Sequence, residues 1–345
     1  MTGVSRRRDR GSAAKPECPE TGTGRSLTAL PGSAGAAAMN RGWSYRDRVG
    51  PGAAGLRIST FYSQNYPHSN AGCWRRRIGD GEIELNGVPA RDDRLLAAGD
   101  ELVWHRPPWQ EPAVPLQFSI IHDDGDLMIV NKPSGLPVMP GGGFLEHTLL
   151  RLLEGCWPSD PPRPVHRLGR GTSGLLICAR QSRSRAWLSA ALRDHGRAPS
   201  EGTAASAVFI EKIYRCRTVK AELETEGRID VPIGRLAHPR LGRLWCADPQ
   251  GLPSRSDYRL LRREANSNLL EVRIRTGRPH QIRIHLAAIG APLLGDPLYV
   301  TGGRAGDFDA LPGDLGYHLH AHRLNLRDPR GQLLRFEAPL PPDLR

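Results

Sequence analysis

The stretch that decides the fold runs from His166 to Ala179 and reads HRLGRGTSGLLICA. The glycine-rich first part, His166–Gly174, is typical of a loop, and the apolar run Leu175–Ala179 that follows it is typical of a buried strand. The fourth residue of this stretch is Gly169, which has neither a nucleophile nor a base. Any chemistry proposed for the loop therefore has to come from another side chain.

The composition limits what the rest of the chain can be. Its 345 residues are enough for two compact domains with a sizeable core. The 48 Lys and Arg against 36 Asp and Glu give a net charge of +12, almost entirely from arginine. Arginine forms bidentate hydrogen bonds with phosphate and stacks on bases, so a polyanionic partner is favoured. The net charge alone is equally consistent with a basic protein that binds no nucleic acid.

The cysteine pattern and the hydropathy exclude several other classes. The six cysteines form no CxxC motif and no Cys/His cluster, so we expect reduced thiols and neither disulfides nor a metal site. No apolar run approaches the roughly 18 residues that span a bilayer, and no secretory h-region follows the N-terminal arginines. We expect an intracellular protein without membrane association, in the cytoplasm or in an organelle.

The N-terminal part divides into an extension and a small module. Residues 1–40 are rich in Arg, Ser, Gly and Ala, which predicts disorder; they could be an organelle transit peptide, or an upstream extension with Met39 as the true start. Residues 50–106 predict a small α+β module with a helix near Leu56–Tyr62 and a strand turning at Asn86-Gly87. The arginine cluster Arg75-Arg76-Arg77 lies between them.

A Pro-rich linker at 107–116 separates this module from a second domain at 117–345. Within that domain, about 193–211 is rich in Gly, Ala and Ser and predicts a long surface insertion. The basic segment His238–Arg243, with Trp245 beyond it, could be solvated charge or an RNA contact.

Four segments of the second domain, in this order, resemble one family. They are Asp124–Pro140, with VNKPSGLPVMPG; HRLGRGTSGLLICAR from His166; KIYR from Lys212; and TGRPHQIRIHLAAIGAPLLGDPLYV from Thr276 to Val300. Together they are similar to the RluA-type RNA pseudouridine synthases, in the form of the plant-type enzymes called RNA pseudouridine synthase 5. Residues 50–106 resemble a small RNA-binding module of ribosomal-protein type.

The resemblance implies an α+β fold with a mixed, mostly antiparallel sheet and a central cleft. It implies an enzyme, an isomerase that converts uridine to pseudouridine in structured RNA, either rRNA or tRNA. The partner is then RNA, no metal or organic cofactor is implied, and we expect a monomer. The target base has to leave its stack, which costs a few kcal/mol.

The resemblance also assigns site residues. Tyr214 falls at the tyrosine that stacks under the uracil, Arg283 at the arginine that pairs with the catalytic aspartate, and Gly169 at that aspartate. Alternation in Ile282–Leu286 predicts a strand that turns Arg283 toward a cleft. Candidate RNA-binding residues are His166, Arg167, Arg170, Thr172, Lys212 and Arg278, together with Arg75, Arg76 and Arg77 of the module.

Gly169 leaves three explanations open. Another carboxylate could enter the site, with Asp160, Asp194, Asp230 and Asp257 as candidates; the chain could bind and flip uridine without isomerising it, in RNA folding or ribosome assembly; or the glycine could be a lineage variant. With glycine at 169, Arg283 would lack its usual counter-ion if it keeps its place. We expect His280 to anchor a loop by hydrogen bonding and Asp296 to stabilise a turn.

Overall fold

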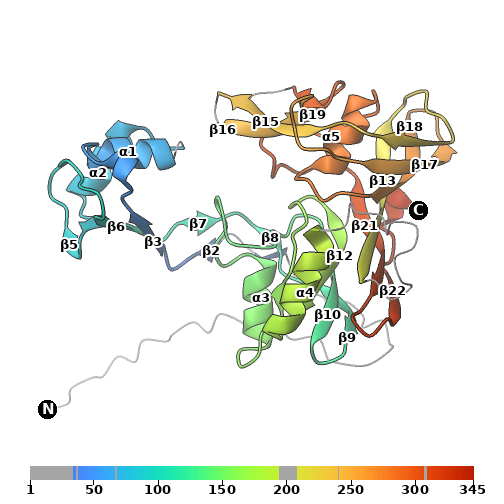
Figure 1. Ribbon diagram of the computed structural model, residues 1–345, viewed down its shortest axis with the longest axis horizontal. Coiled ribbons are helices and arrows are strands. Elements are labelled where there is room, and N and C mark those ends of the chain that lie inside the picture. Colours follow the sequence, from blue (N-terminus) through green and yellow to red (C-terminus); the bar gives the residue numbers. More distant parts are fainter. Residues whose placement is uncertain (1–33, 36–37, 67, 194–207, 240, 307–308) are drawn as a thin grey trace, which may run out of the picture.

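The computed structural model describes residues 34–345 apart from 36–37, 67, 194–207, 240 and 307–308. Figure 1 shows two lobes, a small N-terminal module drawn in blue and a larger domain built around one long sheet. Within the described residues, no helix is long and apolar enough to cross a membrane. Most of residues 1–40 and of the expected insertion at 193–211 lies outside what the structure describes.

The N-terminal module is a four-stranded antiparallel sheet with the order β3-β6-β4-β5 and two helices. The strands are β3 (Trp43–Arg48), β4 (Ile83–Leu85), β5 (Val88–Pro89) and β6 (Glu101–Arg106); the helices are α1 (Ile58–Asn65) and α2 (Ala71–Gly79), after a short 3-10 turn η1 (Pro51–Ala53). The β4–β5 turn at Asn86-Gly87 has positive φ at both residues, as the sequence predicts. Strand β3 lies before residue 50, where we expected the module to begin.

Aromatic rings hold this module together. The Tyr62 and Trp74 rings stack at 4.5 Å between centroids, and Trp104 meets Trp74 edge to face at 4.7 Å. The guanidinium of Arg77 lies over both indoles, 4.3 Å from the Trp74 centroid and 4.7 Å from that of Trp104. Arg77 is thus bound into the core of the module, whereas Arg75 and Arg76 are exposed on α2.

Short strand pairs tie the linker to residues just before the module. Strand β1 (Ala34–Gly35) pairs with β8 (Val114–Pro115), and β2 (Ala38–Met39) pairs with β7 (Gln110–Glu111). The expectation of disorder throughout 1–40 is therefore wrong for these residues, because the extended linker offers free edge groups to pair with. Buried Glu111 accepts hydrogen bonds from Asn40 Nδ2 and from the backbone N–H groups of Glu146 and His147.

The larger domain is built on a ten-stranded mixed sheet with the order β14-β17-β18-β13-β21-β12-β10-β9, where β11 also pairs with β12 and β22 with β21. Among its described pairings, β12 with β21 is parallel and the others are antiparallel. The strands are β9 (Ser119–Asp123), β10 (Leu127–Lys132), β11 (Arg163–Pro164), β12 (Ser173–Ala179), β13 (Phe209–Val219), β14 (Glu226–Ile229), β17 (Ser256–Arg263), β18 (Ser267–Ile274), β21 (Leu319–Arg327) and β22 (Leu333–Glu337).

Helices cover both faces of this sheet, as strand alternation requires. On one face Met128, Val130 and Leu176 pack with α3 (Leu149–Cys156) and α5 (Gln281–Ala288); on the other, Ile129 and Ile177 pack with α4 (Ser182–Arg193). The remaining elements are the hairpins β15 (Ile233–His238) with β16 (Gly242–Ala247) and β19 (Tyr299–Val300) with β20 (Arg304–Ala305), and a final 3-10 turn η2 (Pro342–Leu344).

The prediction of a strand at Ile282–Leu286 is wrong, because these residues lie in the helix α5. His280 precedes the helix in the left-handed region with φ of 56°. The Gln281 side chain then fixes the first turn, accepting from Thr276 Oγ1 and Arg278 N and donating to Arg255 O and Ser256 Oγ. Residues 281–287 are all buried, so the alternation in the sequence does not separate a buried from an exposed face.

His285 on α5 makes the stability of this fold dependent on pH. Its Nε2–H donates to Val231 O and its Nδ1 accepts from Ser256 Oγ, each at 3.0 Å. Burial lowers the pKa of His285 to about 4. Because the unfolded chain takes up this proton near pH 6.5 and the folded chain does not, the free energy of unfolding should fall between pH 6.5 and 4, by up to about 1.4 kcal/mol per pH unit.

We therefore expect His285→Gln to lose less stability than the wild type when the pH is lowered from 7 to 5. Urea unfolding at the two pH values measures this difference. An equal loss in both proteins would show that His285 does not contribute to acid sensitivity.

Candidate active site

The central strands bring the loop His166–Gly174 next to Tyr214. Gly174 at the start of β12 lies opposite Ala321 on β21, and Ala321 lies opposite Tyr214 on β13. Gly174 has a φ of 103°, and a Cβ built on it would lie 2.3 Å from Ala321 O, so only glycine allows this close approach. Leu168, Tyr214 and Tyr317 belong to the same apolar cluster, which places loop and tyrosines on one side of the sheet.

Lys132 at the end of β10 anchors the loop through hydrogen bonds. Its side chain is fully buried, and Nζ donates to the backbone oxygens of Pro133, Leu136 and Arg170 at 2.8 to 3.2 Å. Ser134 Oγ donates to Gly171 O at 2.8 Å. Burial lowers the pKa of Lys132 to about 7. Our sequence analysis missed this residue, although a lysine that ends an apolar strand was a visible signal.

The space beside Gly169 is filled by Tyr317, which the sequence analysis did not single out. A Cβ built on Gly169 would lie 2.9 Å from the Tyr317 hydroxyl oxygen and 3.4 Å from Thr172 Oγ1. A Cβ on Gly171 would lie 2.9 to 3.1 Å from the ring and hydroxyl of the same tyrosine. Tyr317 is buried, with 5% of its surface exposed, whereas Gly169 is exposed.

Arg283 has a counter-ion, contrary to our expectation. The guanidinium is buried and forms a bidentate ion pair with Asp296, with both hydrogen bonds at 2.7 Å, and donates a third to Pro312 O. Burial by itself would lower the pKa of Arg283, but the Asp296 carboxylate outweighs it and raises that pKa. Asp296 also accepts from the N–H groups of Leu298 and Tyr299, the turn role expected for it.

Two tyrosine rings enclose this ion pair. The Arg283 guanidinium carbon lies 4.2 Å from the Tyr317 ring centroid and 4.9 Å from that of Tyr299. Arg283 therefore does not face a cleft as a free cation, because α5 turns it inward between the rings. A cation over an aromatic face contributes up to about 2 kcal/mol when desolvated.

Two glycines place the Asp296 turn beside Tyr317. Gly295 and Gly316 both have positive φ, at 74° and 124°, and each contacts the backbone of the other. A Cβ on Gly295 would lie 2.4 Å from Gly316 O, and one on Gly316 would lie 2.7 Å from Gly295 O. Larger residues at either position would push apart the segments that carry Asp296 and Tyr317.

The histidines of this region are neutral structural groups. His166 Nε2 accepts from Ile177 N at 3.1 Å, and burial, with the nearby Lys212, lowers the pKa of His166 to about 3. His280 Nδ1 contacts the Tyr299 hydroxyl at 2.7 Å, which confirms its hydrogen-bonding position. Because that hydroxyl donates to Trp245 O, His280 has to be the donor through Nδ1.

The basic residues assigned to RNA differ in how free they are. Arg167 is exposed, Arg170 lies 5.2 Å from the Phe144 ring, and Arg278 donates to Pro253 O. Lys212 is half-buried on β13, and burial lowers its pKa to about 8. Thr172 is buried, with Oγ1 3.4 Å from the Tyr317 hydroxyl. Their contacts with RNA stay predictions.

Two of the four carboxylates considered as substitutes, Asp257 and Asp160, lie in ion pairs elsewhere. Asp257 pairs with Arg228, Arg255 and Arg275, and Asp160 is exposed near Arg180. Asp230 is exposed and Asp194 lies outside the described residues. The described parts of the chain hold no group of three or more His, Cys, Asp or Glu side chains that could hold a metal ion.

Breaking the Arg283–Asp296 pair should be costly. Asp296→Asn leaves a buried guanidinium without its counter-ion, and we expect a loss of about 3–5 kcal/mol in the free energy of unfolding. Asp92→Asn, which removes an exposed ion pair with Arg94, is the control and should cost at most about 1 kcal/mol. Urea unfolding compares the two, and similar small losses would contradict a structural role for the buried pair.

The contact between residues 169 and 317 can be measured separately. Gly169→Ala places a Cβ against the Tyr317 hydroxyl, so it should destabilise the fold by about 1–3 kcal/mol. In a Tyr317→Phe background the same change should cost less, because the opposing oxygen is absent. Gly141→Ala, where a Cβ meets nothing within 4 Å, is the control. A cost of Gly169→Ala that does not depend on residue 317 would contradict the contact.

Comparisons with known proteins identify the family of this chain. Residues 126–288 match the family model described as RNA pseudouridylate synthase. An uncharacterised RNA pseudouridine synthase of Synechocystis sp. is 44% identical, covering 82% of this chain and 94% of that protein; RNA pseudouridine synthase 5 of Arabidopsis thaliana is 37% identical, covering 89% and 95%.

More distant relatives extend the agreement to the fold. Ribosomal large subunit pseudouridine synthase D of Nitrosomonas europaea is 33% identical, covering 93% of this chain and 92% of that protein. The solved structure of human RNA Pseudouridylate Synthase Domain Containing 1 shares the fold with a TM-score of 0.50 at 24% identity, over 68% of this chain and 89% of that one. The chain therefore belongs to the RNA pseudouridine synthases of the RluA type, which are intramolecular isomerases.

Proposed function

We propose that this chain converts uridine to pseudouridine in structured RNA, rRNA or tRNA, and that Gly169 stands at the position of the family's catalytic aspartate. The observation that carries this proposal is the placement of the loop His166–Gly174 beside Tyr214 and the Arg283 ion pair at one end of the central sheet. A relative named for the ribosomal large subunit supports rRNA as the substrate class.

The reaction breaks the C1′–N1 bond, turns the uracil and joins C5 to C1′. Tyr214 provides a ring on which the uracil can stack, a contact that contributes about 1–3 kcal/mol to nucleic-acid binding. Burial raises the pKa of Tyr214, so this phenol remains neutral. Exposed Arg167, at the start of the loop, is placed to contact the RNA backbone as the base leaves its stack.

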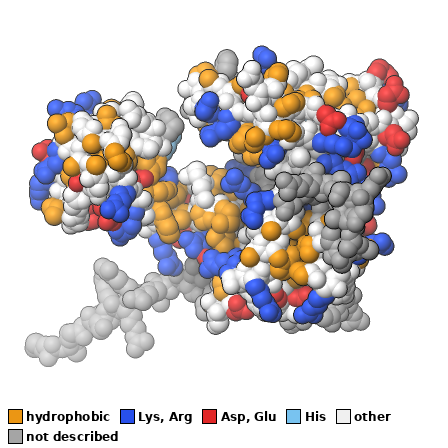
Figure 2. Space-filling model, viewed as in Figure 1, with side chains coloured by type: hydrophobic (Ala, Val, Ile, Leu, Met, Phe, Trp, Pro, Cys, Tyr) orange, Lys and Arg blue, Asp and Glu red, His pale blue; other side chains and the backbone are white. Residues whose placement is uncertain are grey.

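The surface charge supports a binding path for RNA. Figure 2 shows Lys and Arg side chains on the N-terminal module and along the part of the visible face where it meets the larger domain. Arg75 and Arg76 are exposed on α2 of the module. Arg106 at the end of β6 lies 3.4 Å from the Trp109 ring and donates to Gly142 O, so the N-terminal module is attached to the larger domain at this point.

A second candidate function is binding and flipping of uridine without isomerisation. The observation that favours it is the absence of a carboxylate at residue 169 together with the filling of that space by Tyr317. Such a protein would keep the RNA surface and the stacking ring but not the reaction.

Incubation with total RNA, followed by mapping of pseudouridine at single-nucleotide resolution, separates the two functions. We expect the wild type to create new pseudouridines and Tyr214→Leu to create far fewer, because the base loses its stacking partner. Tyr45→Phe in the N-terminal module is the control and should retain the wild-type pattern. No new pseudouridine from the wild type, with RNA still bound, would establish the binding function instead.

RNA binding itself should depend strongly on salt. Each phosphate contact that is lost reduces the slope of log affinity against log salt by about 1. Arg75→Ala combined with Arg76→Ala should therefore lower this slope by about 2, whereas Arg46→Ala, whose guanidinium already pairs with Glu101, should lower it less. Filter binding across a salt series measures the slopes, and an unchanged slope in the double variant would place the RNA elsewhere.

A further inference from the structure

We propose that the hydroxyl of Tyr317 takes the catalytic place of the missing carboxylate, attacking C1′ of the target uridine. The inference rests on the proposed function. Tyr317 packs against both Gly169 and Gly171, in the space that side chains at these two positions would otherwise occupy.

The hydroxyl lies in direct contact with the position that the Cβ of an aspartate at 169 would occupy. It is 2.9 Å from the Cβ position of Gly169, and its contact with Thr172 Oγ1 is 3.4 Å, at the long limit for such a hydrogen bond. The hydroxyl is therefore held in place by the packing of its ring, not by a strong hydrogen bond. This leaves its oxygen lone pairs available to a substrate atom.

Arg283 supplies the electrostatic support that a phenol needs in order to attack. Its guanidinium lies 4.2 Å from the Tyr317 ring centroid, and this positive charge stabilises the phenolate that forms when Tyr317 later leaves C1′. The ionisable groups that face Tyr317 are Arg283 on α5 and, beyond it, Asp296 and Tyr299. Asp296 fixes the guanidinium in this position through its bidentate hydrogen bonds.

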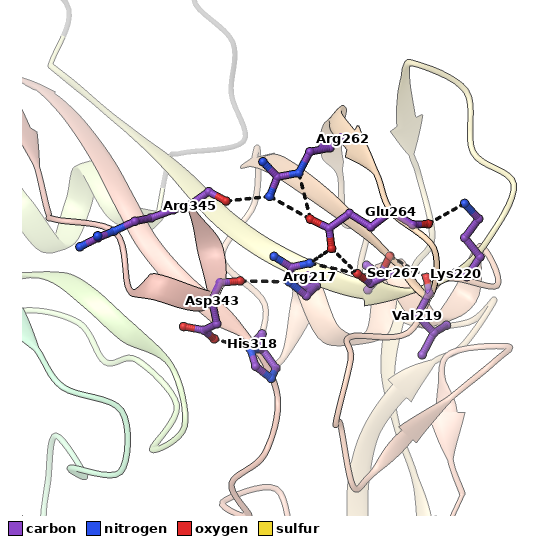
Figure 3. Close-up of polar contacts among 10 residues, drawn as sticks. Arg217, Val219, Lys220, Arg262, Glu264, Ser267, His318, Asp343 and Arg345 are labelled. Atoms are coloured by element: carbon purple, nitrogen blue, oxygen red, sulfur yellow. Dashed lines mark hydrogen bonds and ion pairs between the residues drawn. The ribbon is translucent and has the colours of Figure 1, made fainter.

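The backbone that carries Tyr317 is anchored on its other side. As Figure 3 shows, the next residue, His318, forms a hydrogen bond through Nδ1 with the Asp343 carboxylate near the C-terminus. Arg217 on β13 binds that segment through two hydrogen bonds: its backbone N–H donates to His318 O and its Nε donates to Asp343 O. Its guanidinium also pairs with Glu264. Tyr317 contacts the Cβ positions of Gly169 and Gly171, whereas the side chain of His318 contacts Asp343.

The reaction balances with no co-reactant. The Tyr317 oxygen bonds to C1′ as the C1′–N1 bond breaks, and the phenol proton goes to the departing uracil. The uracil turns on Tyr214, and C5 attacks C1′, which releases Tyr317 as a phenolate. The phenolate then takes the proton from C5, which restores the phenol and completes the isomerisation. A tyrosine nucleophile at an anomeric carbon is known in some glycosidases.

The test removes one oxygen atom. Tyr317→Phe keeps the ring against Gly171 and Arg283, and we expect it to lower the rate of pseudouridine formation by more than about 1000-fold while the RNA affinity and the melting temperature change little. Tyr258→Phe, which removes the hydroxyl of a partly buried tyrosine that also packs on a glycine, is the matched control and should keep the wild-type rate. Wild-type rates in Tyr317→Phe would overturn the inference and leave the proposed function intact.

Two further measurements distinguish attack from packing. With 3-fluorotyrosine at position 317, the pH profile of the rate should move to lower pH, because fluorine makes a phenol more acidic; an unmoved profile would overturn the inference. Adding Gly169→Asp to Tyr317→Phe should restore activity, because a carboxylate then enters the vacated space. If the wild type forms no pseudouridine in any RNA, the inference fails together with the proposed function.

Discussion

The buried ion pair between Arg283 and Asp296 is the interaction on which the site depends. A guanidinium on a helix whose residues 281–287 are all buried is tolerable only with a fixed counter-ion and satisfied hydrogen bonds. Asp296 provides both, and two aromatic rings close the remaining sides. The Gly295 turn and the Gly316 segment, which carry Asp296 and Tyr317, approach each other closely beside this pair.

The contact with Tyr317 changes how Gly169 is interpreted. In the sequence alone, this glycine indicates only that a functional group is missing. In the fold, Gly169 and Gly171 are the positions whose missing side chains make room for a buried tyrosine that also covers Arg283. The glycines and the tyrosine are therefore one packing unit, and a carboxylate introduced at 169 would have to compete with the phenol for the same space.

Much of the architecture could be predicted from local sequence. The Asn86-Gly87 turn, the strand after Gly174 and the order of segments have short-range signals, and the structure has them. The helix α5 could not be predicted in this way, because Ile282–Leu286 has strand-like alternation but is buried on every side. Tyr317 had no local signal at all, since its role comes from packing against a loop that is distant in the sequence. Asp296 was recognised as a turn residue, but its pairing with Arg283 depends on tertiary contacts.

The proposed role of Tyr317 requires its hydroxyl oxygen to lie close to C1′ of the target uridine. A crystal structure with an RNA whose target uridine is bound beside the loop His166–Gly174 gives this distance. We expect about 3–3.5 Å, with the uracil stacked on Tyr214. A carboxylate at that distance from C1′ instead, with Tyr317 turned away from the sugar, would contradict it.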